Sequence, residues 1–330
     1  MKTKLATRFL FALFSSFGGS LAGADTIEAL FIGNSYTGRH NLSEVVEALA
    51  EEGNPDLDFK PTAFIYGGRK LADHWILGTA SIVKLNSLTE AEEKATIASL
   101  EAAIAKNPDL THGKAALRRH QDLLAGLDSR RVKWDRVILQ SWRDDLEGDD
   151  SLYVEYAPKF AKIAQVEGAE VLLYVTTPAT QNAEPLSVPP NAQPTMEKAQ
   201  AIARLANRID ADVAPAFLAA FYCQQERPDL TLRFINDAHL NHTMAYLSAC
   251  SIYAALFDKS PEGLGLDRIT DIRFLDNDPK NRDKDRDGNP ITRVFSERDR
   301  ADLQRIAWKA HGAFKKLRSS LSKQKAPVRY

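Results

Sequence analysis

The sequence predicts an α/β protein of three layers, in which a mostly parallel sheet of five strands lies between helices. Short apolar runs with the length of buried strands recur along the chain, and longer segments of helical periodicity follow them. This alternation continues from about residue 30 to residue 257, which is typical of a parallel sheet covered on both faces. With 330 residues, 44% of them hydrophobic, the chain can bury a full core.

Five apolar segments have the length of buried strands, and they lie at 29–32, 57–65, 135–140, 169–176 and 212–217. The run at 169–176 is the clearest, because valine and leucine continue through it almost without a break. Helices are expected over 41–53, 152–167 and 195–209, and an apolar helix ends near Phe257.

A charged helical insertion interrupts this alternation between the second and third strands. The segment 89–106 is rich in alanine and charged residues, and a second helical piece covers 113–127 after a turn that contains proline. Two helices joined in this way predict a helical hairpin, and we place the insertion at 80–132. Its charge density is too high for a core element, so we expect it on the rim of the sheet.

The C-terminal part is predicted to be a polar loop at 276–295 followed by a helix at 296–321. Within the loop, Asp283, Asp285 and Asp287 match the first half of an EF-hand calcium loop. The twelfth position is Val294 instead of glutamate, so the bidentate ligand is absent. A weak calcium site and a solvated loop are therefore both open, and no other metal is expected.

The first 24 residues have the pattern of a secretory signal peptide. A basic start and a short apolar core are followed by Ala22-Gly-Ala24, a small-x-small cleavage site. The apolar run is too short and interrupted for a membrane anchor. We therefore expect a mature chain that starts near Asp25, forms a single domain over 25–330, is secreted or periplasmic, and keeps no membrane span.

Charge and cysteine content limit the function further. The formal net charge of −1 does not favour nucleic-acid binding, which usually requires a basic domain. The two cysteines, Cys223 and Cys250, lack the spacing of a metal site. Export would permit a disulfide between them, whereas two buried thiols would pack as small apolar side chains. Both alternatives are open.

The chemistry is predicted to lie where the first strand ends. Gly33-Asn34 interrupts that strand and is followed by Ser35, at the carboxyl edge of the sheet, where open α/β folds bind ligands. An ordinary turn is the alternative, since these are common turn residues. A serine nucleophile requires a base, and the base requires a partner that fixes its tautomer. Of the seven histidines, His239 and His242 lie where strand ends converge, and Asp237 is close to His239.

Here the motifs resemble those of the GDSL/SGNH hydrolases. Gly33-Asn34-Ser35 resembles the first block, Gly67-Gly68 the second, and the strand that begins at Asp135 the third. The run Asn236-Asp-Ala-His239 is similar to the fifth block, normally Asp-x-x-His, and the blocks follow the family's order over about 30–257.

The resemblance implies an exported serine esterase that needs no cofactor. Ser35 would attack an acyl carbonyl, and His239 would act as general base. The N–H groups of Ser35 and Gly68 would stabilise the oxyanion. The implied substrate is an O-acyl ester, acetyl being one candidate, on a small molecule or a carbohydrate.

Two departures from the family pattern leave alternatives open. The family's acid is replaced by Asn236, so either Asp237 serves as the acid or a backbone carbonyl orients His239 in a Ser-His dyad. The third block lacks its oxyanion-binding asparagine, and Gln140 or Arg143 could substitute because each carries N–H groups. Two other functions fit the same fold, an acyltransferase and a non-catalytic carbohydrate-binding protein.

Overall fold

A computed structural model describes residues 25–141, 151–176, 182–235, 237–274 and 279–323. The predicted signal peptide at 1–24 therefore lies outside the described residues, as do Arg143 and Asn236. None of the helices in the described segments is long and apolar enough to cross a membrane.

A parallel five-stranded sheet forms the centre of the molecule, with strand order β2-β1-β3-β4-β5. Its strands are β1 (Asp25–Gly33), β2 (Leu57–Ile65), β3 (Arg136–Leu139), β4 (Glu170–Tyr174) and β5 (Asp212–Ala214). Every neighbouring pair is parallel, so the predicted fold class is confirmed. The chain leaves β1 toward β2 on one side and returns to β3 on the other. The end of β1 is therefore the topological switch point, where α/β folds bind their ligands.

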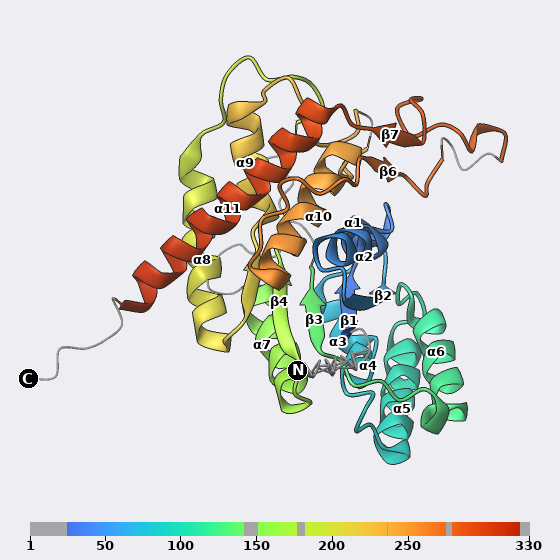
Figure 1. Ribbon diagram of the computed structural model, residues 1–330. Coiled ribbons are helices and arrows are strands. Elements are labelled where there is room, and N and C mark those ends of the chain that lie inside the picture. Colours follow the sequence, from blue (N-terminus) through green and yellow to red (C-terminus); the bar gives the residue numbers. More distant parts are fainter. Residues whose placement is uncertain (1–24, 142–150, 177–181, 236, 275–278, 324–330) are drawn as a thin grey trace, which may run out of the picture.

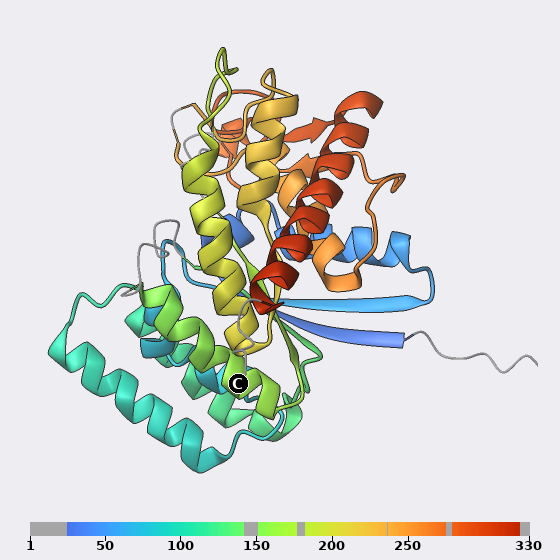
Figure 2. The same cartoon turned by 90° about the vertical axis from the view of Figure 1, so that its left-hand side faces the viewer.

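Helices cover both faces of this sheet. On one face α2 (Leu42–Gly53) packs against α10 (His242–Phe257), and on the other α3 (Leu71–Ile76) and α4 (Thr79–Val83) pack against α7 (Leu152–Val166). Figure 2 shows α2 and α10 on one side of the strands and α7 on the other. Helices α8 (Ala192–Ile209) and α11 (Glu297–Lys323) lie side by side near the β5 edge (Figure 1). Almost every residue of α10 is buried, because this helix is apolar on all sides.

The helical insertion is a hairpin of α5 (Glu90–Lys106) and α6 (Gly113–Ala125), which projects from one end of the molecule (Figure 1). The two helices are joined by a buried pair, in which His120 Nδ1 lies 2.6 Å from Glu93 Oε1. The segment predicted as the insertion, 80–132, also contains residues of the main core. Ile82, Val83 and Leu88 are buried in the main core, so the peripheral part begins near Thr89.

Two regions differ from the sequence prediction. The segment 212–217 was predicted as one strand, but β5 ends at Ala214 and a buried helix, α9 (Ala216–Glu226), begins after Pro215. Proline suits the start of a helix and not the interior of a strand, because it lacks an N–H group. The second difference is a small antiparallel sheet of β6 (Arg268–Thr270) and β7 (Thr292–Val294). Strand β7 lies within the predicted polar loop, which also contains the 3₁₀ turn η3 (Pro279–Asn281).

Candidate active site

Ser35 is the first residue of α1 (Ser35–Gly38), a single turn of helix that starts where β1 ends. Asn34 caps this turn, since its side-chain oxygen accepts the N–H of Tyr36 at 3.0 Å. Gly33 is required by close packing. A Cβ at this position would lie 2.4 Å from Thr37 Oγ1 and 2.8 Å from Gln140 Oε1. The Gly-Asn-Ser motif thus allows a tight turn that directs Ser35 out of the core.

Two buried side chains support this turn from below. Gln140 Oε1 accepts the Asn34 N–H at 2.9 Å, and His74 donates from Nε2 to the Gly33 carbonyl at 3.0 Å. Burial lowers the pKa of His74 to about 3, so its ring is neutral and can accept from Thr79 Oγ1 at Nδ1. Neither role was predicted, because neither residue is near Ser35 in the sequence.

The structure brings Ser35, His239 and Asp237 together across about 200 residues of sequence. His239 Nε2 lies 2.8 Å from Ser35 Oγ, and Nδ1 is hydrogen-bonded to Asp237 Oδ1. Asp237 Oδ1 also accepts the His239 backbone N–H at 3.0 Å. The partner of the His239 ring is therefore Asp237 and not a backbone carbonyl.

The His239 loop, of which the structure describes Ile235 and residues 237–239, is held on both sides. The Tyr36 hydroxyl donates to the Ala238 carbonyl at 2.9 Å. The Tyr36 ring packs edge to face on the His239 imidazole, with 5.8 Å between the two ring centres. The two ends of the loop are joined by a backbone hydrogen bond, because the Phe234 N–H donates to the His239 carbonyl at 3.2 Å. The imidazole is thus placed by neighbours on α1 as well as by its own loop.

The Asp237 carboxylate is strongly favoured in its charged form. Burial opposes ionisation, but hydrogen bonds from His239 and Arg39 outweigh burial and hold the pKa of Asp237 well below its usual value. Its second oxygen, Oδ2, accepts from the Arg39 guanidinium at 2.8 Å and lies 3.5 Å from Arg286 Nε. Asp237 is therefore an anion at neutral pH, which is the state that the partner of a candidate general base requires.

Backbone N–H groups beside Ser35 supply candidate oxyanion donors. The Ser35 N–H belongs to the first turn of a helix, where such groups have no intrahelical acceptor. Gly68 follows β2 and has a φ of +67°, which glycine adopts without strain. The Asn34 side-chain amide donates to the Arg69 carbonyl at 3.1 Å, and this bond links the loop at 66–69 to the turn that carries Ser35.

The third predicted donor does not fit this geometry. Gln140 is fully buried, its Oε1 accepts from Asn34, and its Nε2 donates to the Ser141 carbonyl. Gln140 therefore supports the turn and is not accessible as an oxyanion donor. Arg143, the other donor named from the sequence, lies outside the described residues, as does Asn236.

The acidic residues of the polar loop bind protein groups. Asp285 Oδ1 accepts the N–H groups of Asp287 and Asn289, both at 2.9 Å, and the Asp287 carboxylate accepts the Ile235 N–H at 3.0 Å. In the described segments, no group of three or more histidine, cysteine or acidic residues could hold a metal ion. Asp283 is exposed, near Lys284. The half EF-hand motif therefore forms a loop whose Asp287 binds the backbone of Ile235, at the start of the His239 loop.

Both cysteines are free and buried. Cys223 lies in α9 and Cys250 in α10, and burial raises the pKa of the Cys223 thiol to about 12. Of the two alternatives left open by the sequence, the structure has the pair of buried thiols.

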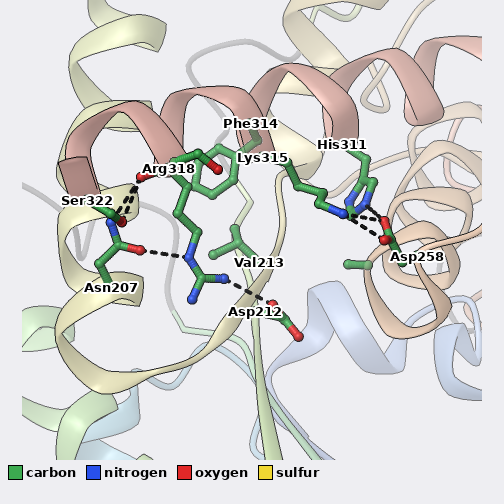
Figure 3. A pocket seen from close by; sticks show the side chains of 11 residues that line it. Asn207, Asp212, Val213, Asp258, His311, Phe314, Lys315, Arg318 and Ser322 are labelled. Carbon is green, nitrogen blue, oxygen red and sulfur yellow. Dashed lines mark hydrogen bonds and ion pairs between the residues drawn. The ribbon is translucent and has the colours of Figure 1, made fainter.

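A pocket of about 430 Å³ lies away from this site, between α8, α11 and the start of β5 (Figure 3). Its charged groups are paired with one another. Lys315 and His311 contact Asp258, and Arg318 contacts Asp212 at 3.0 Å. Because Asp212 opens β5, the pocket lies at the amino end of that strand, opposite the edge that carries Ser35.

No family model matches the chain, and no curated protein matches it. Solved structures with a similar fold include a protein from Slackia heliotrinireducens that has been assigned by inference to the SGNH hydrolases. It has 16% identity and a TM-score of 0.41, and the match covers 70% of this chain and 100% of that one. A DUF4886 family protein from Bacteroides uniformis has 15% identity and a TM-score of 0.47, and the match covers 87% of this chain and 95% of that one.

A third solved structure, TesA, has 14% identity and a TM-score of 0.37, and the match covers 70% of this chain and 98% of that one. At these identities the likeness concerns the fold alone, and the chemistry must be argued from the site.

Proposed function

We propose that this protein is a serine hydrolase that cleaves carboxylic esters. The observation that carries the proposal is the continuous set of contacts from Ser35 Oγ through His239 to Asp237. These groups lie at the carboxyl end of β1, beside the switch point of the sheet. A nucleophile, a base within hydrogen-bond reach and an acid that orients the base are the parts that acyl transfer to a serine requires.

In the proposed mechanism, Ser35 Oγ attacks the acyl carbonyl while His239 Nε2 takes its proton. Asp237 keeps the other proton on Nδ1 and stabilises the imidazolium. The N–H groups of Ser35 and Gly68 stabilise the oxyanion. His239 then returns its proton to the leaving alkoxide, which departs as the alcohol. Water, deprotonated by His239, releases the acid and restores Ser35. No step needs a cofactor.

The substrate class is proposed from the sequence. The signal-peptide pattern supports export, and the resemblance of the motifs supports an O-acyl ester, such as an acetyl ester, on a small molecule or a carbohydrate. N-terminal sequencing of the secreted form tests export, and a chain that still starts at Met1 would contradict it.

The proposed chemistry is tested by labelling the purified mature protein with a fluorophosphonate and mapping the modified peptide. We expect labelling at Ser35, which is lost in Ser35→Ala and kept in Ser87→Ala, a matched control at an exposed serine of the α4–α5 connection. Hydrolysis of 4-nitrophenyl acetate should follow the same pattern. A protein that neither labels nor hydrolyses would instead favour the carbohydrate-binding alternative. Transfer of the acyl group to an added sugar in preference to water would indicate an acyltransferase.

A further inference from the structure

Arg39 is a fully enclosed arginine one helical turn after the nucleophile. It is 1% exposed, it caps the C-terminus of α1, and its N–H donates to the Ser35 carbonyl at 2.9 Å. Its guanidinium carbon lies 4.2 Å from the centre of the Phe234 ring, which directly precedes the His239 loop. The short helix that begins with Ser35 therefore ends with a cation directed toward that loop.

The Arg39 guanidinium joins two aspartates. Nε lies 3.1 and 3.2 Å from the two oxygens of Asp271, and one terminal nitrogen donates to Asp271 Oδ2 at 2.8 Å. The other terminal nitrogen donates to Asp237 Oδ2 at 2.8 Å. A planar fork with several donors can make both contacts at once, whereas a lysine ammonium cannot reproduce this geometry.

Asp271 is itself fixed in place. It is fully buried just after β6, and its Oδ1 accepts the Arg273 N–H at 2.9 Å. The neighbouring Ile272 N–H donates to the Arg39 carbonyl at 3.0 Å, so the backbone of Arg39 is held by the same segment as its side chain. The backbone and the side chain of Arg39 are thus both held in place without any contribution from Asp237.

We propose that Arg39, anchored by Asp271, is a positioning residue that holds Asp237 in the orientation His239 needs. The inference rests on the hydrolase mechanism proposed above. Asp237 must present Oδ1 to the imidazole, and a carboxylate bound through one oxygen alone could rotate about its Cβ–Cγ bond. The charge-assisted bond at Oδ2 prevents this rotation. It also favours the carboxylate form, so that the shared proton stays on His239 Nδ1.

The alternative is that Arg39 and Asp271 form a buried ion pair with a purely structural role. Removing one partner of such a pair destabilises a protein by leaving an uncompensated buried charge. That role predicts less folded protein with unchanged turnover per folded molecule. The positioning role predicts lower turnover in molecules that remain folded. Arg286 also faces Asp237, but its side chain is 32% exposed and lies 3.5 Å away, so it holds the carboxylate less rigidly.

The experiment compares Arg39→Lys with wild type in the mature full-length chain, with activity normalised to the folded fraction. We expect kcat on 4-nitrophenyl acetate and the rate of fluorophosphonate labelling to fall by about 10²-fold, as for a catalytic group misplaced by about 1 Å, while KM stays nearly constant. The matched control is Arg227→Lys. Arg227 is also nearly buried and contacts Asp299 and Asp302 at 2.7 and 2.8 Å, but none of these residues contacts the Ser35–His239–Asp237 set in the described structure. It should lose stability and keep its kcat.

A second variant covers the case in which Arg39→Lys does not fold. Arg39→Met combined with Asp271→Asn removes the buried cation and its anchoring anion together, and it should show the same loss of kcat. A folded variant of either kind with the kcat of wild type would overturn the proposal.

A second readout separates this inference from the proposed function. In the NMR spectrum of wild type, we expect a protected His239 Nδ1–H signal, which should be lost in Arg39→Lys and kept in Arg227→Lys. If wild type neither labels nor hydrolyses, the proposed function fails. The NMR comparison still decides whether Arg39 places Asp237, and an Nδ1–H signal that persists in Arg39→Lys would show that it does not.

Discussion

Replacing Asp237 with asparagine should abolish most of the activity, because neither oxygen position tolerates an amide NH₂ group. An NH₂ at Oδ2 would face the Arg39 donor that now lies 2.8 Å away. An NH₂ at Oδ1 would face the His239 backbone N–H, now at 3.0 Å. The same NH₂ group would donate to His239 Nδ1, so the ring proton would move to Nε2. His239 Nε2 could then no longer accept the proton of Ser35.

The expected size of this effect follows from these contacts. The wrong histidine tautomer in a serine triad lowers kcat by about 10⁴-fold, which equals about 5.4 kcal/mol of barrier at 1.36 kcal/mol per factor of ten. The unmatched donor should also cost roughly 1–3 kcal/mol of unfolding free energy. Because the pKa of Asp237 is depressed in the folded state, its stabilising contribution is present above the unfolded value of about 3.9 and is lost only as the pH falls below it. The protonation of Asp237 itself should therefore add no pH dependence to the stability difference between wild type and variant from pH 5 to 8.

The assay is kcat on 4-nitrophenyl acetate, with urea unfolding on the same samples. Asp283→Asn, at an acid of the polar loop whose side chain is 76% exposed, is the matched control and should behave as wild type. If Asp237→Asn keeps kcat within tenfold of wild type, Asp237 is not the third member of a triad, and a Ser-His dyad must be considered again.

Three further predictions concern groups around the site and in the core. Burial lowers the pKa of His40 well below its usual value, so stability should fall as the pH drops through about 6.5, and His40→Phe should remove up to about 1.4 kcal/mol per pH unit of that slope in urea unfolding. An unchanged slope would refute this. Cys223 and Cys250 should not react with a thiol reagent in the folded protein and should give two thiols after denaturation, whereas fewer than two would indicate oxidation. His112→Ala removes the ring donor to the Gly67 carbonyl at 3.0 Å, so kcat/KM should fall by up to about 10²-fold with little change in melting temperature. Unchanged kinetics would show that this bond does not position the loop.

The sequence predicted the elements that depend on local patterns. Apolar runs between turn residues located all five strands, and the parallel topology then placed Ser35 and the loop before α10 at one edge of the sheet. Asp237 could be named because it is two residues from His239. What remained open was whether it turns toward the ring, and that depends on contacts with distant parts of the chain.

Residues whose roles arise from long-range contacts could not be predicted. Arg39 meets Asp271 across 232 positions, and nothing near either residue in sequence indicates the pairing. Only Arg39 could have been singled out from the sequence, because it is a charged residue one helical turn after a candidate nucleophile. Helix α9 was missed for a different reason. Its apolar residues are buried on all sides, and composition alone does not separate a short buried helix from a strand.

The order in which the chain is made bears on when the proposed chemistry can start. All five sheet strands are present once residue 214 has been synthesised, and Asp237 and His239 follow soon after. Asp271 and Asp287, which hold Arg39 and the start of the His239 loop, come later still. A chain that ends at residue 267 would contain all three proposed reacting groups. It would lack Asp271, which anchors the buried Arg39, and also α11, which packs against α8, α9 and α10. We expect such a chain to resist fluorophosphonate labelling, so that reactivity would report completion of the polypeptide as well as its folding.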